Sequence, residues 1–281
     1  DNNPWNYKFT WNPRNVVLAG QGKGGIKYLS KGSYKYIPYY NLFKHSKSIA
    51  VGNYGDFDAY PNRDSLKYRS VYGLNDIQTM LRGTLRRSGF CRAWDIFVQL
   101  GMTDDSYALD IDENTSCADF MNCFIDSDKH ADIKLNLADQ MQIDEHDPLL
   151  DKFTWLGMFS KDIAIGKTGS PAQILQAILE RKLKLEDADK DWVLMYHEFE
   201  FLERGERKKI ESCLSIEGRD SYDTAMALTV GLPIGISCKL ISYGKIQERG
   251  VLLPIHREFY EPILDELKHV GIEFEETESI I

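Results

Sequence analysis

The middle of the chain, residues 113–187, follows a helical pattern throughout, whereas the segments on both sides alternate between apolar and polar residues. The helices expected in it span residues 118–125, 132–142 and 148–158, followed by a helix that opens at Ser170-Pro171. Strand patterns that flank a helical segment predict a mixed α/β (α+β) fold. We expect one mixed-sheet domain made of residues 1–112 and 188–281, with residues 113–187 as an all-helical insert.

The flanking segments contain recognisable strands and helices. The expected elements are a hairpin over residues 26–37 with a turn at Gly32, a strand over 57–60 that ends at Pro61, a short helix over 64–72, a strand over 79–86, a helix over 88–101, a long hairpin over 192–216 with a turn at Gly205, and an amphipathic helix over 256–270. The most apolar run, residues 225–241, is interrupted by glycine, proline and polar residues. We interpret it as a buried core helix that does not span a membrane.

Charge and cysteine content exclude several classes of protein. The net charge is -9, from 43 acidic and 34 basic residues, which argues against a nucleic-acid binder. The five cysteines include no C-x-x-C pair, and the histidines are scattered, so we expect reduced thiols and no metal site. Without a visible signal peptide, the sequence predicts a cytoplasmic protein without a membrane partner.

A glycine-rich run, with Gly20, Gly22 and Gly25, formally matches the dinucleotide-binding fingerprint. Two features argue against that function. Asn12-Pro13 predicts a helix that these glycines end, whereas the fingerprint requires glycines that open a helix. No Asp or Glu occurs between Asn2 and Gly55 to bind a ribose hydroxyl. We therefore interpret the run as a helix exit, with autonomous NAD(P) binding as the alternative.

The candidate site lies between Tyr54 and Phe90, where Arg63 and Arg86 each follow a short apolar run. An arginine side chain is a forked donor suited to bidentate capture of a carboxylate. Neutral hydrogen-bonding residues lie nearby in sequence: Asn62, Ser65 and Thr84. The stretch predicts a site for a small molecule with several carboxylates. Spacing alone leaves a second interpretation open, in which the two arginines pair with local acidic residues.

Six short segments resemble saccharopine dehydrogenase of the glutamate-forming type, also called saccharopine reductase. They are Lys8-Phe9-Thr10-Trp11, Ala59-Tyr60-Pro61-Asn62-Arg63-Asp64-Ser65, Leu81-Arg82-Gly83-Thr84-Leu85-Arg86, Trp155-Leu156-Gly157, Thr224-Ala225-Met226-Ala227 and Gly250-Val251-Leu252-Leu253-Pro254. The resemblance covers essentially the whole chain, in register. It implies an enzyme of lysine metabolism that interconverts saccharopine with glutamate and aminoadipate semialdehyde by hydride transfer with NADP or NAD.

The resemblance also assigns residues to the site. It implies that Arg63 and the segment Thr84-Leu85-Arg86 contact saccharopine, which carries several carboxylates and one amine. Trp11 would border the substrate, and Asn12 would lie next to the cofactor. No acid–base residue follows from the resemblance. Tyr60 and His197 are candidates by residue type only, and a histidine on an apolar strand face is more often part of a core.

One departure from the family is large. Its members begin with a Rossmann domain that carries the true glycine fingerprint, and the sequence shows no counterpart of it. We therefore expect this chain to be the C-terminal, substrate-binding and dimerisation part of such an enzyme, a homodimer that is inactive without the N-terminal Rossmann domain. The alternative is a non-catalytic module that binds a carboxylated metabolite or only dimerises.

Overall fold

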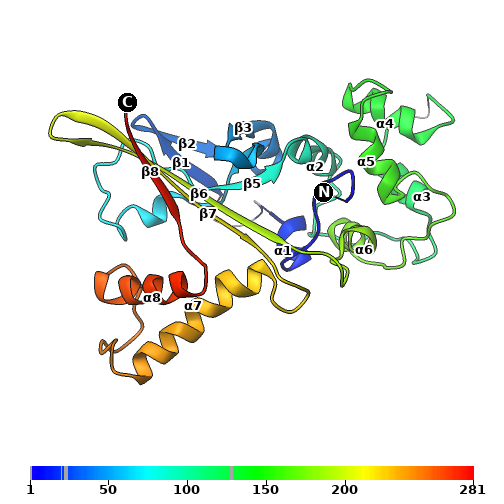
Figure 1. Cartoon of the computed structure of the whole chain (residues 1–281). Helices are drawn as coiled ribbons and strands as arrows, with labels where there is room; N and C mark the ends of the chain where they lie inside the picture. Colours follow the sequence, from blue (N-terminus) through cyan, green and yellow to red (C-terminus); the bar gives the residue numbers. More distant parts are fainter. Residues whose placement is uncertain (1, 20, 22–24, 127–128) are drawn as a thin grey trace. The chain divides into compact units, whose positions relative to one another are not determined.

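The computed structural model describes residues 2–19, 21, 25–126 and 129–281 (Figure 1). The chain divides into two compact units, Asp1–Lys184 and Leu185–Ile281. Within the described residues, helices accompany small antiparallel sheets. This arrangement confirms the predicted mixed α/β class.

The first unit contains two small sheets. Strand β1 (Ile26–Ser30) pairs with β2 (Ser33–Ile37) through a tight turn at Lys31 and Gly32, which have φ angles of 48° and 76°. Positive φ at both turn residues suits the right-handed twist of a two-residue hairpin. The predicted hairpin is confirmed.

The second sheet of this unit has the order β3-β4-β5. Its strands are β3 (Lys47–Ala50), β4 (Asp56–Pro61) and β5 (Gly83–Arg87), all antiparallel. The helix expected over residues 64–72 is wrong, because only one 3-10 turn, η4 (Leu66–Tyr68), forms there. The hydroxyl of Ser65 accepts from the backbone N–H of Arg82 at 2.9 Å, so it does not cap a helix.

The helices of the first unit follow the expected order. They are α1 (Pro13–Val17), α2 (Phe90–Gln99), α3 (Cys117–Asn122), α4 (Ile133–Met141), α5 (Leu149–Leu156) and α6 (Pro171–Leu183), with 3-10 turns η1 (Tyr39–Asn41), η2 (Phe43–His45) and η3 (Gly52–Tyr54). Asn12 caps α1 by accepting from the N–H of Arg14, as its position predicts. Ser170 and Gln173 form a capping box at α6.

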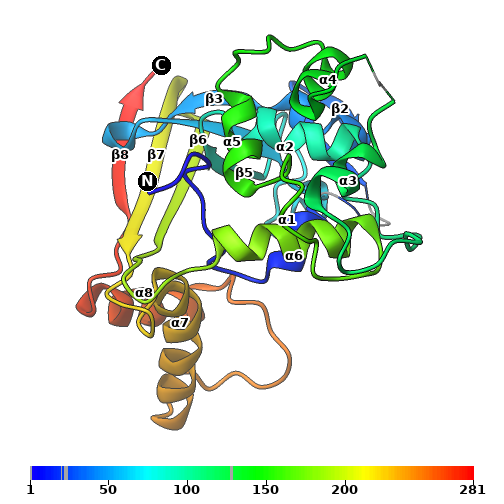
Figure 2. The same ribbon diagram turned by 90° about the vertical axis from the view of Figure 1, so that its right-hand side faces the viewer.

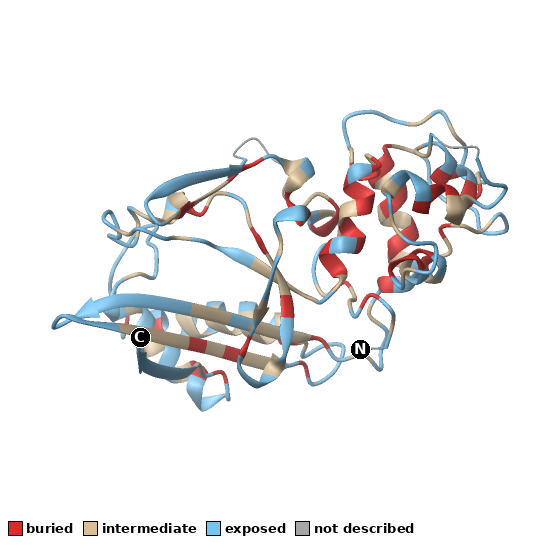
Figure 3. Ribbon diagram, turned by 90° about the horizontal axis from the view of Figure 1, so that it is seen from above, coloured by how far each residue is buried: buried red, intermediate tan, exposed pale blue. Residues whose placement is uncertain are grey.

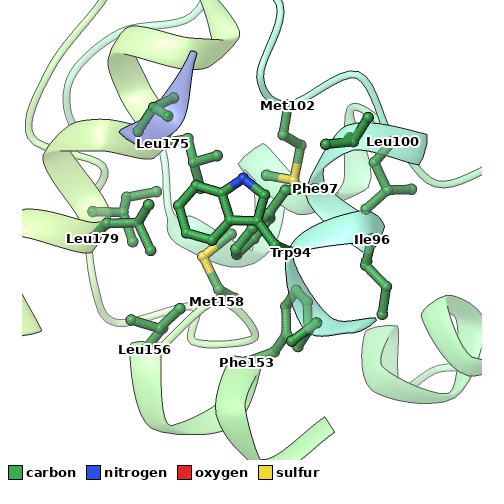
Figure 4. Packing of buried hydrophobic residues seen from close by; sticks show 14 of the residues in the cluster. Trp94, Ile96, Phe97, Leu100, Met102, Phe153, Leu156, Met158, Leu175 and Leu179 are labelled. Atoms are coloured by element: carbon green, nitrogen blue, oxygen red, sulfur yellow. The ribbon is translucent and has the colours of Figure 1, made fainter. Parts of the chain in front are cut away.

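An aromatic cluster lies at the centre of this unit. Trp5 is 1% exposed and stacks on Phe97 at 5.8 Å. Phe97 in turn meets Phe153 of α5 at 5.0 Å (Figure 4). Buried residues concentrate in the helices of the first unit (Figure 3). The helical segment therefore shares one core with residues that precede it. The predicted grouping of residues 1–112 with 188–281 as one domain is untested and stays a prediction.

The second unit is a three-stranded antiparallel sheet, β6 (Trp192–Glu203), β7 (Glu206–Glu217) and β8 (Glu275–Ile280), with two helices. The predicted long hairpin is confirmed, with its turn at Gly205. Helices α7 (Ala225–Ser242) and α8 (Arg257–His269) lie side by side on one face of the sheet (Figure 2). Their core is small and centres on Leu214.

Helix α7 differs from its prediction. We expected a buried core helix, but Ala225 and Leu240 are its only buried residues. The core of this unit covers just one side of α7, through Leu228, Leu232 and Ile236. By length and composition alone the helix is able to cross a membrane, which is weak evidence because core helices of soluble proteins pass the same test.

Candidate functional site

The pairing of β4 with β5 brings several predicted site residues onto one surface. Tyr60 lies opposite Thr84, and Asp58 lies opposite Arg86. Because side chains alternate along a strand, these four residues share one face of the sheet. Leu85 lies between them in sequence and points to the other face.

The guanidinium of Arg86 is held by aromatic rings and lacks a charged partner among the described residues. Its Cζ lies 5.0 Å from the centroid of the Tyr7 ring and 5.4 Å from that of Phe90. Its Nε is buried without a hydrogen-bond partner, and Nη1 donates to the carbonyl of Leu85 at 3.3 Å. A partly buried cation without a carboxylate partner among the described residues is suited to an anionic ligand.

The acidic residue opposite Arg86 is engaged elsewhere. Oδ2 of Asp58 accepts from the backbone N–H groups of Gly89 at 3.0 Å and Cys91 at 3.2 Å, at the start of α2. Gly89 is the N-cap of α2 and has no side chain to cap it, so Asp58 supplies the acceptor and a favourable charge at the helix N-terminus. This contact argues against the interpretation in which Arg86 merely pairs with a local acid.

Two phenols lie beside this cation. Burial raises the pKa of Tyr7 and of Tyr60, and the neighbouring positive charge of Arg86 acts in the opposite direction at both. Thr84 also acts against the rise in the pKa of Tyr60. Both phenols are therefore protonated at neutral pH and are able to donate hydrogen bonds.

Thr84 is oriented by an amide from the end of β4. Nδ2 of Asn62 donates to Oγ1 of Thr84 at 3.1 Å. The same hydroxyl also hydrogen-bonds the Tyr60 phenol, which opposes the rise in the pKa of Tyr60. The face of β4 and β5 therefore presents a guanidinium, a hydroxyl and a phenol close together, which is suited to a carboxylate.

Arg63 follows directly after this strand, in an unusual conformation. Its φ is 52°, in the left-handed region, which costs an L-residue about 1–2 kcal/mol. Its side chain is exposed, and the neighbouring Asp64 pairs with Lys27 at 3.0 Å. Strained backbone at a predicted binding residue is consistent with a functional constraint.

Trp11 and Asn12 lie in the segment that leads into α1. The Trp11 ring is 53% exposed, and the side-chain oxygen of Asn12 accepts from the N–H of Arg14 at 2.9 Å. The structure brings Thr84 and Arg86 together with Asn62 and Tyr60. Among the described residues, no side-chain hydrogen bond, ion pair or ring contact joins Arg63, Trp11 or Asn12 to them, and the site assignments made from the resemblance stay predictions.

Sequence reasoning missed the two rings that hold Arg86. Tyr7 belongs to an aromatic N-terminal run, and Phe90 falls in the helix expected over residues 88–101. Strand register could have placed Arg86 beside Tyr60 and Thr84. The Tyr7 contact joins residues far apart in sequence and has no local signal.

The remaining candidates contribute less. In the glycine-rich run, Gly20 and Gly22 lie outside the described residues, although α1 does end before them, at Val17. His197 stacks on Phe199 at 5.9 Å, and burial lowers its pKa, which favours a core histidine. In the part of the chain that the structure describes, no three His, Cys, Asp or Glu residues gather to hold a metal ion.

Comparisons with known proteins identify the family of the chain. A family model described as the saccharopine dehydrogenase C-terminal domain matches residues 1–272. The chain is 31% identical to saccharopine dehydrogenase (NADP(+), L-glutamate-forming) of Saccharomyces cerevisiae, over 95% of this chain and 60% of that protein. It is 32% identical to mitochondrial alpha-aminoadipic semialdehyde synthase of Bos taurus, over 99% of this chain and 30% of that protein.

A solved structure shows the same fold. The apo, histidine-tagged saccharopine dehydrogenase (L-Glu forming) from Saccharomyces cerevisiae aligns with a TM-score of 0.86 and 29% identity, covering 99% of this chain and 63% of that one. The chain thus spans less than two thirds of the relatives it matches. Because the family model covers nearly its whole length, the chain belongs to the saccharopine dehydrogenase C-terminal domain family.

Proposed function

We propose that this chain is the substrate-binding C-terminal portion of a glutamate-forming saccharopine dehydrogenase, an oxidoreductase of lysine metabolism. The whole enzyme would interconvert saccharopine with glutamate and aminoadipate semialdehyde. One observation carries the proposal: the Arg86 guanidinium is partly buried and packs against two aromatic rings, without a described carboxylate partner. Saccharopine offers several carboxylates to such a group.

The residues of the chain would divide the work of holding the substrate. Arg86 and Arg63 would each bind a carboxylate, and the Thr84 hydroxyl would donate to a carboxylate or contact the amine. Leu85 lies between Thr84 and Arg86 in β5, and this position would place it in the segment that contacts the substrate. Trp11 would exclude water from one side of the bound substrate.

The cofactor would be held mainly outside this chain. NADP or NAD, when bound, supplies or accepts the hydride, and the N-terminal Rossmann domain would bind most of it. Asn12 is the residue of this chain that we place next to the cofactor. Because its carbonyl oxygen is committed to capping α1, its amide N–H₂ is the group left to donate.

Calorimetry on this chain with saccharopine, and separately with NADP, tests the proposal. Saccharopine binding at about millimolar Kd or better without cofactor supports a substrate-binding portion. Silence towards both ligands favours the alternative, a scaffold or dimerisation module. Binding of the cofactor alone would instead support an autonomous NAD(P) site near Gly25.

Kinetics on the complete enzyme address Arg63. Replacing Arg63 by alanine should raise the KM for saccharopine far more than the KM for the cofactor, because its proposed role is in binding substrate only. Equal changes in both constants, or none, would remove Arg63 from the site.

Two further proposals have tests of their own. Light scattering tests whether the protein is a homodimer, as proposed. Cell fractionation tests the proposed cytoplasmic location.

A further inference from the structure

The face of β4 and β5 that forms the candidate site continues beyond the start of β5. There the backbone N–H of Asn62 donates to the carbonyl of Arg82 at 2.8 Å, which extends the pairing of the two strands by one residue. A Cβ built on Gly83 would lie 3.5 Å from Cδ2 of Leu81, so residues 81 and 83 share the other face. Because side chains alternate along a strand, Arg82 belongs to the face that carries Thr84.

The guanidinium of Arg82 is held in the same manner as that of Arg86. Its Cζ lies 5.2 Å from the centroid of the Tyr68 ring, and its Nη1 donates to the Tyr68 hydroxyl at 2.7 Å. The backbone N–H of Arg82 donates to the Ser65 hydroxyl, which fixes the base of the side chain. Among the described residues, no carboxylate pairs with Arg82. A stacked guanidinium without an acidic partner is suited to a carboxylate of a ligand.

The spacing of Arg82 and Arg86 matches the length of saccharopine. Four residues of extended strand span about 13 Å, because each residue adds about 3.3 Å. The two outermost carboxyl carbons of saccharopine are joined by about ten single bonds, which span about 12 Å when the chain is extended. The amine and the third carboxylate of saccharopine lie between these ends, as Thr84 lies between the two arginines.

We propose that Arg82 and Arg86 bind the carboxylates at opposite ends of an extended saccharopine molecule. This inference rests on the proposed function, and it assigns a residue to the carboxylate that Arg63 and Arg86 leave over. The substrate would lie along β5 with its amine beside Thr84. Arg82 would then determine specificity, because glutamate is too short to reach both guanidinium groups.

The competing interpretation is that Arg82 only anchors the segment between β4 and β5. That segment has other anchors, which do not involve the Arg82 side chain. Asp64 pairs with Lys27 at 3.0 Å, and Leu29 and Met80 exchange backbone hydrogen bonds of 3.1 and 2.9 Å. Truncating Arg82 should therefore leave the segment in place, so that ligand binding is measured on folded protein.

Two analogues of saccharopine test the assignment, each lacking the carboxylate at one end. In the first, hydrogen replaces the carboxylate of the lysine part, and in the second it replaces the outer carboxylate of the glutamate part. Binding is measured by calorimetry on this chain, and as inhibition of the complete enzyme where affinity is low. Arg82→Ala should weaken saccharopine binding about tenfold or more and leave the binding of one analogue within about twofold. Arg86→Ala should spare the other analogue, because each arginine meets one end only.

Two variants serve as controls, and the Tm of every variant is measured alongside. Arg87→Ala, on the other face of β5, should bind all three ligands within about twofold of the wild type. Arg82→Lys keeps the charge without the fork and should lose less affinity than Arg82→Ala. The assignment is overturned if Arg82→Ala binds saccharopine as the wild type does. It is also overturned if saccharopine and both analogues weaken by the same factor, which is the result expected of a purely structural residue.

The proposed function and this assignment fail in different ways. A wild-type chain that binds no saccharopine would refute the proposed function and the assignment together. Saccharopine binding that is lost in Arg86→Ala but kept in Arg82→Ala would refute the assignment of Arg82 alone.

Discussion

Replacing Tyr7 by leucine tests whether ring stacking holds Arg86 ready for a carboxylate. The Arg86 Cζ lies 5.0 Å from the Tyr7 ring and 5.4 Å from the Phe90 ring, so leucine removes one of two cation–π contacts. Such a contact is worth about 1–2 kcal/mol when partly desolvated. If the substrate needs the held geometry, the loss corresponds to roughly 5- to 30-fold weaker saccharopine binding.

The assay is the saccharopine Kd of the chain, or the saccharopine KM and kcat of the complete enzyme. Tyr7→Phe keeps the ring and should stay within about twofold of the wild type. Because Tyr7 also packs on Phe9 at 5.6 Å, the Tm of each variant must be measured alongside. The reasoning is refuted if Tyr7→Leu stays folded and binds saccharopine normally while Arg86→Ala does not. It is also refuted if the phenylalanine variant loses as much affinity as the leucine variant.

Three further predictions concern stability. Asp58→Ala should lower the free energy of unfolding by about 1–2 kcal/mol in urea, because Gly89 and Cys91 lose their acceptor; a loss no larger than that of a surface mutant would contradict this. Ser170→Ala should cost about 1 kcal/mol through the lost capping box, and an unchanged urea midpoint would argue against it. Burial lowers the folded-state pKa of His197 below its ordinary value of 6.5. The unfolded state therefore binds the proton more tightly than the folded state. As a result, the free energy of unfolding falls as the pH drops from about 6.5 through the folded-state pKa. His197→Gln should flatten that slope, and a persisting slope would exclude His197 as its source.

Local patterns were sufficient for most of the secondary structure. Period-two alternation and turn glycines located the hairpins at Gly32 and Gly205, and the Ser170-Pro171 start located α6. The errors arose where a tertiary contact decided the outcome. A helix was expected over residues 64–72, but the hydroxyl of Ser65 at its start accepts from the backbone N–H of Arg82 instead. No local signal predicts that competition.

The same limit applies to α7 and to the aromatic core of the first unit. An apolar run shows that a segment needs burial, but it does not show which surface buries it. The core around Trp5 joins the N-terminal segment to α2 and α5 through contacts across about half of the chain, such as that with Phe153. Periodicity reports on one element at a time and therefore could not show that the helical segment shares this core.

The sequence alone predicted the arginines of the candidate site but not the contacts that leave them available. The forked side chains of Arg63 and Arg86 suggested carboxylate binding before any contact was known. Their availability could not be predicted, because it depends on where nearby acids are used. Asp58 is occupied by the start of α2, and Asp64 is paired with Lys27. Because these two acids are engaged elsewhere, Arg63 and Arg86 are candidates for ligand binding.

The most direct test of the central claim is the saccharopine affinity of Arg86→Ala, compared with Arg87→Ala as the matched control. Arg87 lies on the other face of β5, where its guanidinium covers the Phe57 ring at 4.9 Å. Losing a charge-assisted contact of about 1.5–3 kcal/mol should weaken binding roughly 10- to 150-fold for Arg86→Ala. The control should bind within about twofold of the wild type. Equal affinity in the wild type and Arg86→Ala would contradict the assignment of this face to the substrate.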